Sequence, residues 1–106
     1  MKRQRVVVTG LGVVSSLGIG WRAFWESLLA GRSGIHKIEY LDTADYPTHY
    51  GGEVTGFNPL DFMPTSVARR VGRGTQFALA ATKMAFEDAG LVSRRYIDIR
   101  RGRSAL

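Results

Sequence analysis

The sequence predicts an α/β fold, and three segments carry that prediction. Residues 5–9 form a short run rich in β-branched side chains that ends at Gly10, which is the pattern of a buried strand. Residues 21–30 and 76–89 repeat apolar side chains every three or four positions, which is the pattern of amphipathic helices. The chain has 106 residues, of which 44% are hydrophobic, so it is long enough for one domain and too short for two.

The first predicted helix, at residues 21–30, follows a glycine-rich turn and ends at Gly31, a residue suited to a left-handed C-terminal cap. One broad face of this helix gathers its large apolar side chains, which are Trp21, Phe24, Trp25, Leu28 and Leu29. Two tryptophans on a single helix predict that the helix is heavily buried.

Residues 32–62 are interrupted repeatedly by glycine and proline, so we expect irregular chain there. Short strands fit residues 35–40 and 52–54. A loop-rich segment of this length inside a compact domain is expected to pack on a neighbouring element.

Two helices are expected in the last third of the chain. A short one runs to Arg70 with Thr65 or Ser66 as its cap, and a longer one at residues 76–89 is capped by Thr75. The longer helix ends in the manner of a Schellman cap, at a glycine followed by a leucine. Its inner stripe is rich in alanine, which predicts close packing against a helix or sheet; the stripe comprises Phe77, Ala80, Ala81, Met84, Ala85 and Asp88.

The net charge of +6 is concentrated at one end of the chain. Five arginines and one aspartate lie in residues 94–103, which gives this tail a net charge of +4 and leaves +2 for residues 1–93. The tail has one aromatic residue, and the chain has no zinc-finger, RNP or KH signature. A solvated basic end is therefore the better interpretation, and we expect no nucleic-acid partner.

The absence of cysteine excludes disulfides, cysteine-ligated metals and a cysteine nucleophile within this chain. No apolar run approaches the roughly 20 residues that cross a bilayer. The apolar stretch near the N-terminus is too short for the core of a signal peptide. These features predict a cytoplasmic protein without a membrane partner.

Gly10, Leu11 and Gly12 imitate the start of the dinucleotide fingerprint G-x-G-x-x-G that follows a strand. Ser15 stands where the third glycine belongs, and residues 16–20 delay the helix whose N-terminus should hold the pyrophosphate. A tight turn beside a packed strand is the better interpretation, so we assign no cofactor-binding residue.

His36 and His49 are the only histidines, and their spacing matches no metal-ligand motif, so we expect surface or hydrogen-bonded histidines and no metal site. No serine lies in a G-x-S-x-G elbow. Glu87 and Asp88 are expected to be solvated residues near a helix end rather than an acid–base pair. We therefore assign no catalytic residue.

Arg69, Arg70 and Arg73 form a compact basic cluster between the two predicted C-terminal helices. Two interpretations remain open on the residues alone. The arginines either form a solvated face that offsets a helix dipole, or they dock an acidic partner or a phosphate group.

Two long segments, RVVVTGLGVVS at residues 5–15 and AFWESLLAGRSGI at residues 23–35, together resemble the opening of β-ketoacyl-acyl-carrier-protein synthases. The fatty-acid elongation type II enzymes are the most similar. Shorter matches follow in the same order at residues 57–59, 69–70, 75–78 and 87–91. The resemblance predicts that residues 1–92 are the N-terminal part of a ketosynthase domain and that residues 93–106 are an unaligned basic tail.

The resemblance implies an incomplete thiolase-like fold, in which two similar halves stack as αβαβα layers, usually within a homodimer. It also implies acyltransferase chemistry, that of a 3-oxoacyl-[acyl-carrier-protein] synthase in fatty acid biosynthesis. A cysteine takes an acyl chain from the phosphopantetheine of an acyl carrier protein, and the carbanion left by decarboxylation of malonyl-carrier protein attacks that chain. Two histidines stabilise the charged intermediates. None of these catalytic residues matches a position here, so we expect the chain to be inactive alone and to need no cofactor of its own.

The family meets its acidic carrier protein through basic residues that precede the helix corresponding to residues 76–89. Arg69 and Arg70 match those positions, which favours carrier-protein docking over a solvated face. Ser66 stands where the family has a third basic residue, which predicts a weaker dock. Val71 and Gly72 stand where the family has an acidic residue after the basic pair, and Gly72 and Gly74 are expected to loosen the start of the next helix. A polyketide-type ketosynthase, its chain-length partner, and a carrier-protein-binding module remain alternatives.

Overall fold

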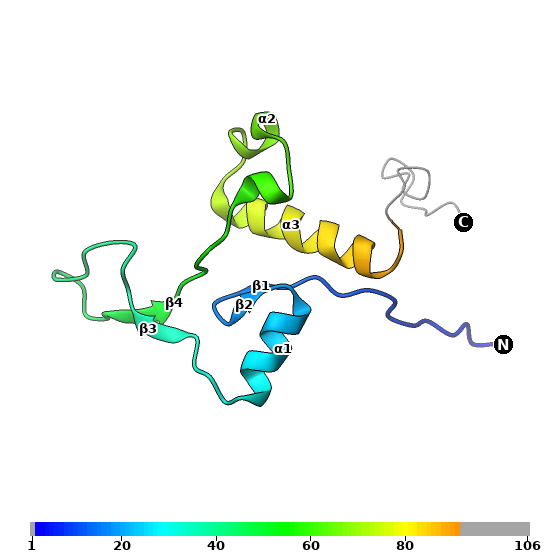
Figure 1. Cartoon of the computed structure of the whole chain (residues 1–106), viewed down its shortest axis with the longest axis horizontal. Helices are drawn as coiled ribbons and strands as arrows, with labels where there is room; N and C mark the ends of the chain where they lie inside the picture. The colour runs from blue at the N-terminus through cyan, green and yellow to red at the C-terminus, as the bar shows by residue number, and fades with distance from the viewer. Residues whose placement is uncertain (1, 92–106) are drawn as a thin grey trace.

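The computed structural model describes residues 2–91 (Figure 1). In chain order the elements are β1 (Val14–Ser15), β2 (Gly18–Ile19), α1 (Trp21–Leu29), β3 (Ile35–Lys37), β4 (Tyr50–Gly52), the 3-10 turn η1 (Pro59–Asp61), α2 (Thr65–Ala68) and α3 (Arg73–Asp88). The mixture of helices and strands agrees with the predicted α/β class.

The β1–β2 hairpin lies between the two longer helices, with α3 on one side and α1 on the other (Figure 1). Val14 pairs with Ile19 and Ser15 with Gly18. The Ser15 hydroxyl donates to the Gly18 carbonyl at 3.1 Å and accepts the Leu17 amide at 3.2 Å, so the turn is closed by its own side chain.

The chain before this hairpin packs very closely on α3. A Cβ atom on Gly10 would overlap the carbonyl oxygen of Ala85, and one on Gly12 would overlap that of Ala81. Only glycine permits this approach of backbone to backbone. The close packing predicted for the alanine-rich stripe is therefore confirmed, but its partner at Gly10 and Gly12 is irregular chain and not the expected helix or sheet.

The prediction of a buried strand at residues 5–9 is wrong. Residues 2–13 lie outside any helix or strand, and Val6, Val7 and Val8 are 91%, 71% and 81% exposed. A strand needs a neighbour to receive its hydrogen bonds and cover its side chains. Within residues 2–91 no strand pairs with this segment.

The first predicted helix is confirmed as α1, but its burial is not. Trp21 and Trp25 are 37% and 51% exposed, and Ser27 is the one buried residue of the helix. The expected glycine stop is present: Gly31 has a positive φ of 68° and donates to the Leu28 carbonyl. Leu11 and Val13 line a hollow together with Trp21, Phe24 and Trp25, and both tryptophans remain partly exposed within the described chain.

The irregular middle of the chain forms an arm. Strand β3 pairs with β4 in an antiparallel ribbon, so both expected short strands exist with shifted bounds. Residues 38–49 close the arm, which extends away from the helices (Figure 1). The Glu53 carboxylate accepts the backbone amides of Glu39 and Tyr40 at 3.2 and 2.9 Å, which fixes the chain at the exit of β3.

Both helix starts expected in the last third need correction. Pro64 is the N-cap of α2, so Thr65 is already helical, and Gly72 is the N-cap of α3, so Thr75 lies inside its first turn. Neither start has a side-chain cap. The C-terminal prediction for α3 is confirmed, because the Leu91 amide donates to the Phe86 carbonyl at 2.8 Å, as a Schellman cap requires.

The core of the described residues is small. Met63 and Ala80 are the buried hydrophobic residues there, and the radius of gyration is 17.5 Å. A compact chain of this length would have a radius of about 13 Å. In the part of the chain that the structure describes, no helix has both the length and the apolar character needed to span a bilayer.

Candidate functional site

The two arginines singled out by the sequence lie at the C-terminal end of α2. Arg69 is the C-cap residue of that helix, and its amide donates to the Thr65 carbonyl at 3.0 Å. The Arg70 amide donates to the Val67 carbonyl at 3.0 Å, so the backbone of both arginines is fixed by the helix end. Both side chains are exposed.

The guanidinium groups of Arg69 and Arg70 are not engaged by other described residues. Among residues 2–91 neither arginine forms an ion pair or donates a side-chain hydrogen bond, and the ion pair found there joins Lys83 to Glu87. Two adjacent cations on a fixed helix end are thus open to an external anion. We call this pair the Arg69/Arg70 surface.

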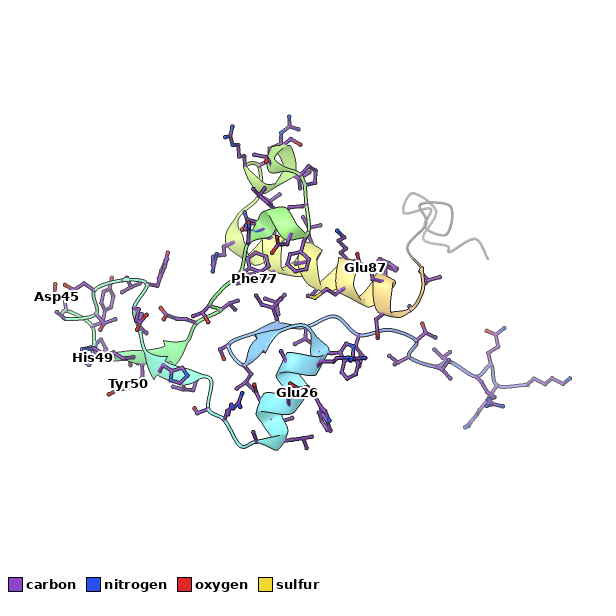
Figure 2. All side chains as sticks on the ribbon, in the orientation of Figure 1. Glu26, Asp45, His49, Tyr50, Phe77 and Glu87 are labelled. Carbon is purple, nitrogen blue, oxygen red and sulfur yellow. The ribbon has the colours of Figure 1, made fainter. Side chains whose placement is uncertain are left out.

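An aromatic cluster lies between η1 and the start of α3. The Phe57 ring stacks on Phe62 with centroids 5.6 Å apart and meets Phe77 edge-on at 4.9 Å. The cluster joins η1 to the first half of α3, and Phe77 lies at the end of α3 that is nearer α2 (Figure 2). The Gln76 side-chain amide donates to the Ala68 carbonyl at 3.0 Å, which ties the end of α2 to α3.

The side chain of Arg73, unlike those of Arg69 and Arg70, contacts other described residues. Its guanidinium carbon lies 4.9 Å from the Phe77 ring centre and 5.8 Å from that of Phe57, within cation–π range of both. Its Nη2 atom also donates to the Val54 carbonyl at 3.3 Å. The structure therefore divides the predicted cluster into an open pair, Arg69 and Arg70, and a third arginine that packs on the aromatic rings.

The two histidines are placed far from this surface, on the β3–β4 arm. His36 pairs with Gly51 in the ribbon, and His49 Nδ1 lies 2.9 Å from the hydroxyl of the buried Thr43. Figure 2 shows His49 on the arm and Phe77 on α3, well apart. Within residues 2–91 no three His, Cys, Asp or Glu side chains are grouped to hold a metal ion.

The glycine-rich turn has a packing role. Gly10 and Gly12 contact the backbone of α3 in the middle and at the end of that helix. Val13, the residue after Gly12, accepts a hydrogen bond of 2.8 Å from the amide of Gly20, the N-cap of α1, so the turn also lies beside the start of that helix.

The sequence interpretation missed two roles. Asp88, expected to be merely solvated, accepts the Leu11 amide at 2.9 Å and so joins two distant segments. The sequence groups Arg73 with Arg69 and Arg70 in one basic cluster and does not indicate that its side chain packs on aromatic rings. The spacing of four residues between Arg73 and Phe77 on one helix is the signal that could have indicated packing on that ring.

Comparisons with known proteins identify the family of this chain. The family model described as "Beta-ketoacyl synthase, N-terminal domain" matches residues 3–103. The 3-oxoacyl-[acyl-carrier-protein] synthase 2 of Vibrio cholerae is 42% identical over 91 residues, which are 86% of this chain and 22% of that protein. The protein of the same name from Staphylococcus aureus is 41% identical over 90 residues, again 22% of its length.

A solved structure is similar as well. The structure titled "The ishigamide ketosynthase/chain length factor" matches with a TM-score of 0.75 and 41% identity, over 85% of this chain and 22% of that one. This chain therefore spans about a fifth of the length of the relatives it matches. From the family match and these similarities, the chain belongs to the β-ketoacyl synthase family and has the mixed helix-and-strand fold of that family's N-terminal segment.

Proposed function

We propose that this chain is the N-terminal part of a 3-oxoacyl-[acyl-carrier-protein] synthase and that the Arg69/Arg70 surface docks the acyl carrier protein. The observation that carries the docking proposal is the contrast among the three arginines. Arg69 and Arg70 are exposed and unpaired among the described residues, whereas Arg73 packs on two phenylalanine rings. A fixed helix end bearing two open cations suits a partner rich in carboxylates.

The reaction proposed for the whole enzyme is decarboxylative condensation. A cysteine thiolate takes the acyl group from the phosphopantetheine thioester of one carrier protein, malonyl-carrier protein loses carbon dioxide, and the resulting carbanion attacks the acyl-enzyme. This chain has no cysteine and therefore cannot supply the nucleophile. We infer that the 106-residue chain is inactive alone and contributes partner recognition.

A condensation assay tests the inactivity. The purified chain is mixed with an acyl-carrier protein and malonyl-carrier protein, and release of carbon dioxide and formation of the 3-oxoacyl product are followed. The proposal expects neither to exceed the rate without protein. Turnover by the purified chain contradicts it.

The docking surface is tested by charge reversal. Arg69→Glu together with Arg70→Glu should weaken binding of a phosphopantetheinylated acyl carrier protein about tenfold or more, because two favourable charge pairs become repulsive. The matched control is Arg32→Glu with Lys37→Glu, which makes the same change in net charge on exposed residues of another part of the chain. Equal losses for both pairs mean that only net charge matters, and the surface assignment is then wrong.

A second candidate is a segment of a polyketide-type ketosynthase or of its chain-length partner. The similarity to the ishigamide ketosynthase/chain length factor favours it, since the TM-score of 0.75 extends over 85% of this chain. The two candidates differ in the carrier protein that they meet. Binding is therefore compared between a fatty-acid carrier protein and a polyketide carrier protein, and the tighter partner decides.

The proposal also covers the assembly, the location and the cofactor needs of the whole enzyme. The whole enzyme is inferred to be a homodimer, as expected for the family, and to act in the cytoplasm. The family's acyl groups arrive on the carrier protein's own phosphopantetheine, so the proposal assigns no separate cofactor to this chain.

A further inference from the structure

The helix that carries the Arg69/Arg70 surface is a single turn long. α2 spans Thr65–Ala68 and has no side-chain cap at its N-terminus. A helix this short does not hold its shape in water by itself, so its orientation depends on contacts with its neighbours. Two such contacts are present: α2 packs against η1, and the side chain of Gln76 bonds to the last carbonyl of α2.

The bond from Gln76 lies directly next to Arg69. Nε2 of Gln76 donates to the Ala68 carbonyl at 3.0 Å, and that carbonyl belongs to the planar peptide group that also contains the Arg69 amide. The Arg69 amide donates to the Thr65 carbonyl at 3.0 Å. Both polar ends of this peptide group are therefore bonded, which fixes the direction in which the Arg69 side chain leaves the backbone.

Gln76 is held in place by its own helix. It lies at the end of the first turn of α3, is half-buried, and its amide donates at 3.0 Å to the carbonyl of Gly72, the N-cap residue. The next residue, Phe77, packs edge-on against Phe57. Within the described chain, the bond from Gln76 to Ala68 is the one hydrogen bond that joins α3 to α2.

We infer that Gln76 is the positioning residue of the Arg69/Arg70 surface and thereby raises the affinity of that surface for the acyl carrier protein. The inference rests on the proposed docking function and adds a residue that acts through the two arginines. Cations whose backbone is held before binding lose less freedom when they meet an acidic partner, so a preorganised pair binds more tightly. The donor, the acceptor and both arginines all lie within residues 68–76, so the arrangement is complete in this chain.

Gln76→Met tests the inference, because methionine has a similar length and no hydrogen-bond donor. The affinity of the full chain for a phosphopantetheinylated acyl carrier protein, measured by titration where the variant is folded, should fall about threefold or more. The matched control is Thr82→Val, which removes a bond of 2.7 Å from a side-chain hydroxyl to the Ala78 carbonyl in the second half of the same helix. The control should leave the affinity unchanged, and equal losses for the two variants overturn the inference.

A double-variant cycle separates positioning from a general loss of structure. In the Arg69→Ala background, where Arg70 still supports binding, Gln76→Met should reduce the affinity by a smaller factor than in the unmodified chain, because one of the arginines through which it acts is gone. A chain that is merely destabilised loses the same factor in both backgrounds. An equal factor in both backgrounds therefore overturns the inference.

Amide hydrogen exchange gives a readout without the carrier protein. The Arg69 amide should exchange about threefold or more faster in Gln76→Met, because the turn of α2 opens more often without its anchor, whereas Thr82→Val should not change its rate. An unchanged rate in Gln76→Met overturns the inference. If the unmodified chain does not bind the carrier protein, the docking proposal fails and the inference fails with it; if the unmodified chain and Gln76→Met bind equally, the inference alone fails.

Discussion

The backbone amide of Leu11 donates a hydrogen bond of 2.9 Å to Oδ2 of Asp88, a residue 77 positions later in the chain. This bond joins the N-terminal segment to the last turn of α3. Gly10 and Gly12 stand on either side of Leu11 and bring the backbone against the same helix. The charged acceptor and the two glycines together determine where α3 lies relative to the hairpin.

Replacing Asp88 should loosen this junction. Asp88→Ala removes the acceptor of the Leu11 amide, and a hydrogen bond to a charged group at an exposed site contributes about 0.5–1.5 kcal/mol. We expect the free energy of unfolding in urea to fall by that amount. Asp88→Asn keeps a carbonyl oxygen at the same position and should lose less, so equal losses for the two variants contradict a role for the hydrogen bond.

Gly12→Ala tests the close contact with α3. The added methyl group would overlap the Ala81 carbonyl, so the helix must move away, at a cost of about 1–3 kcal/mol. Thermal unfolding followed by circular dichroism gives the change in stability. An unchanged midpoint of thermal unfolding would show that Gly12 and α3 are not in close contact.

Gly74→Ala should have the opposite effect. Gly74 lies in the first turn of α3, and nothing lies within 4 Å of the position that a Cβ atom would occupy. Alanine reduces the conformational freedom of the unfolded chain and favours the helix by up to about 1 kcal/mol. The same unfolding measurement should show a gain, and a loss would mean that α3 does not begin at Arg73.

Arg73→Ala should lower the stability of the chain and leave its affinity for the carrier protein almost unchanged. It removes the packing of the guanidinium on Phe57 and Phe77 and the bond to Val54, which predicts a loss of stability of about 0.5–1.5 kcal/mol. Carrier-protein affinity at a temperature where the variant is folded should change less than about threefold, since one partly engaged cation is lost. A loss as large as that of the Arg69→Glu, Arg70→Glu variant contradicts the division of the cluster.

The helices could be predicted because their signals are local. The period of the apolar residues located α1 and α3, and Gly31 and Gly90 gave the correct C-terminal ends. The helix starts were misplaced because a threonine within a few residues of a start is a common cap, whereas here Pro64 and Gly72 precede the helices and no side chain caps them.

Local signals could not show whether residues 5–9 pair as a strand or how deeply α1 is buried. Both depend on elements that lie alongside, and within residues 2–91 Val7 is 71% exposed and Trp25 51% exposed. The valines have the right propensity for a strand, but pairing is a tertiary property. At the candidate site, the positions of Arg69 and Arg70 were indicated by the sequence, whereas the packing of Arg73 required the structure.

The most direct test of the account is a charge-swap measurement at the Arg69/Arg70 surface. Binding is measured for the unmodified chain and for the Arg69→Glu, Arg70→Glu variant, each with an acyl carrier protein and with a carrier protein whose acidic recognition residues are changed to lysine. The account predicts that each single swap weakens binding and that the double swap restores much of it, because the two sets of charges contact each other. Additive losses without restoration, or an affinity that neither swap changes, would contradict the claim that Arg69 and Arg70 contact the acidic residues of the carrier protein.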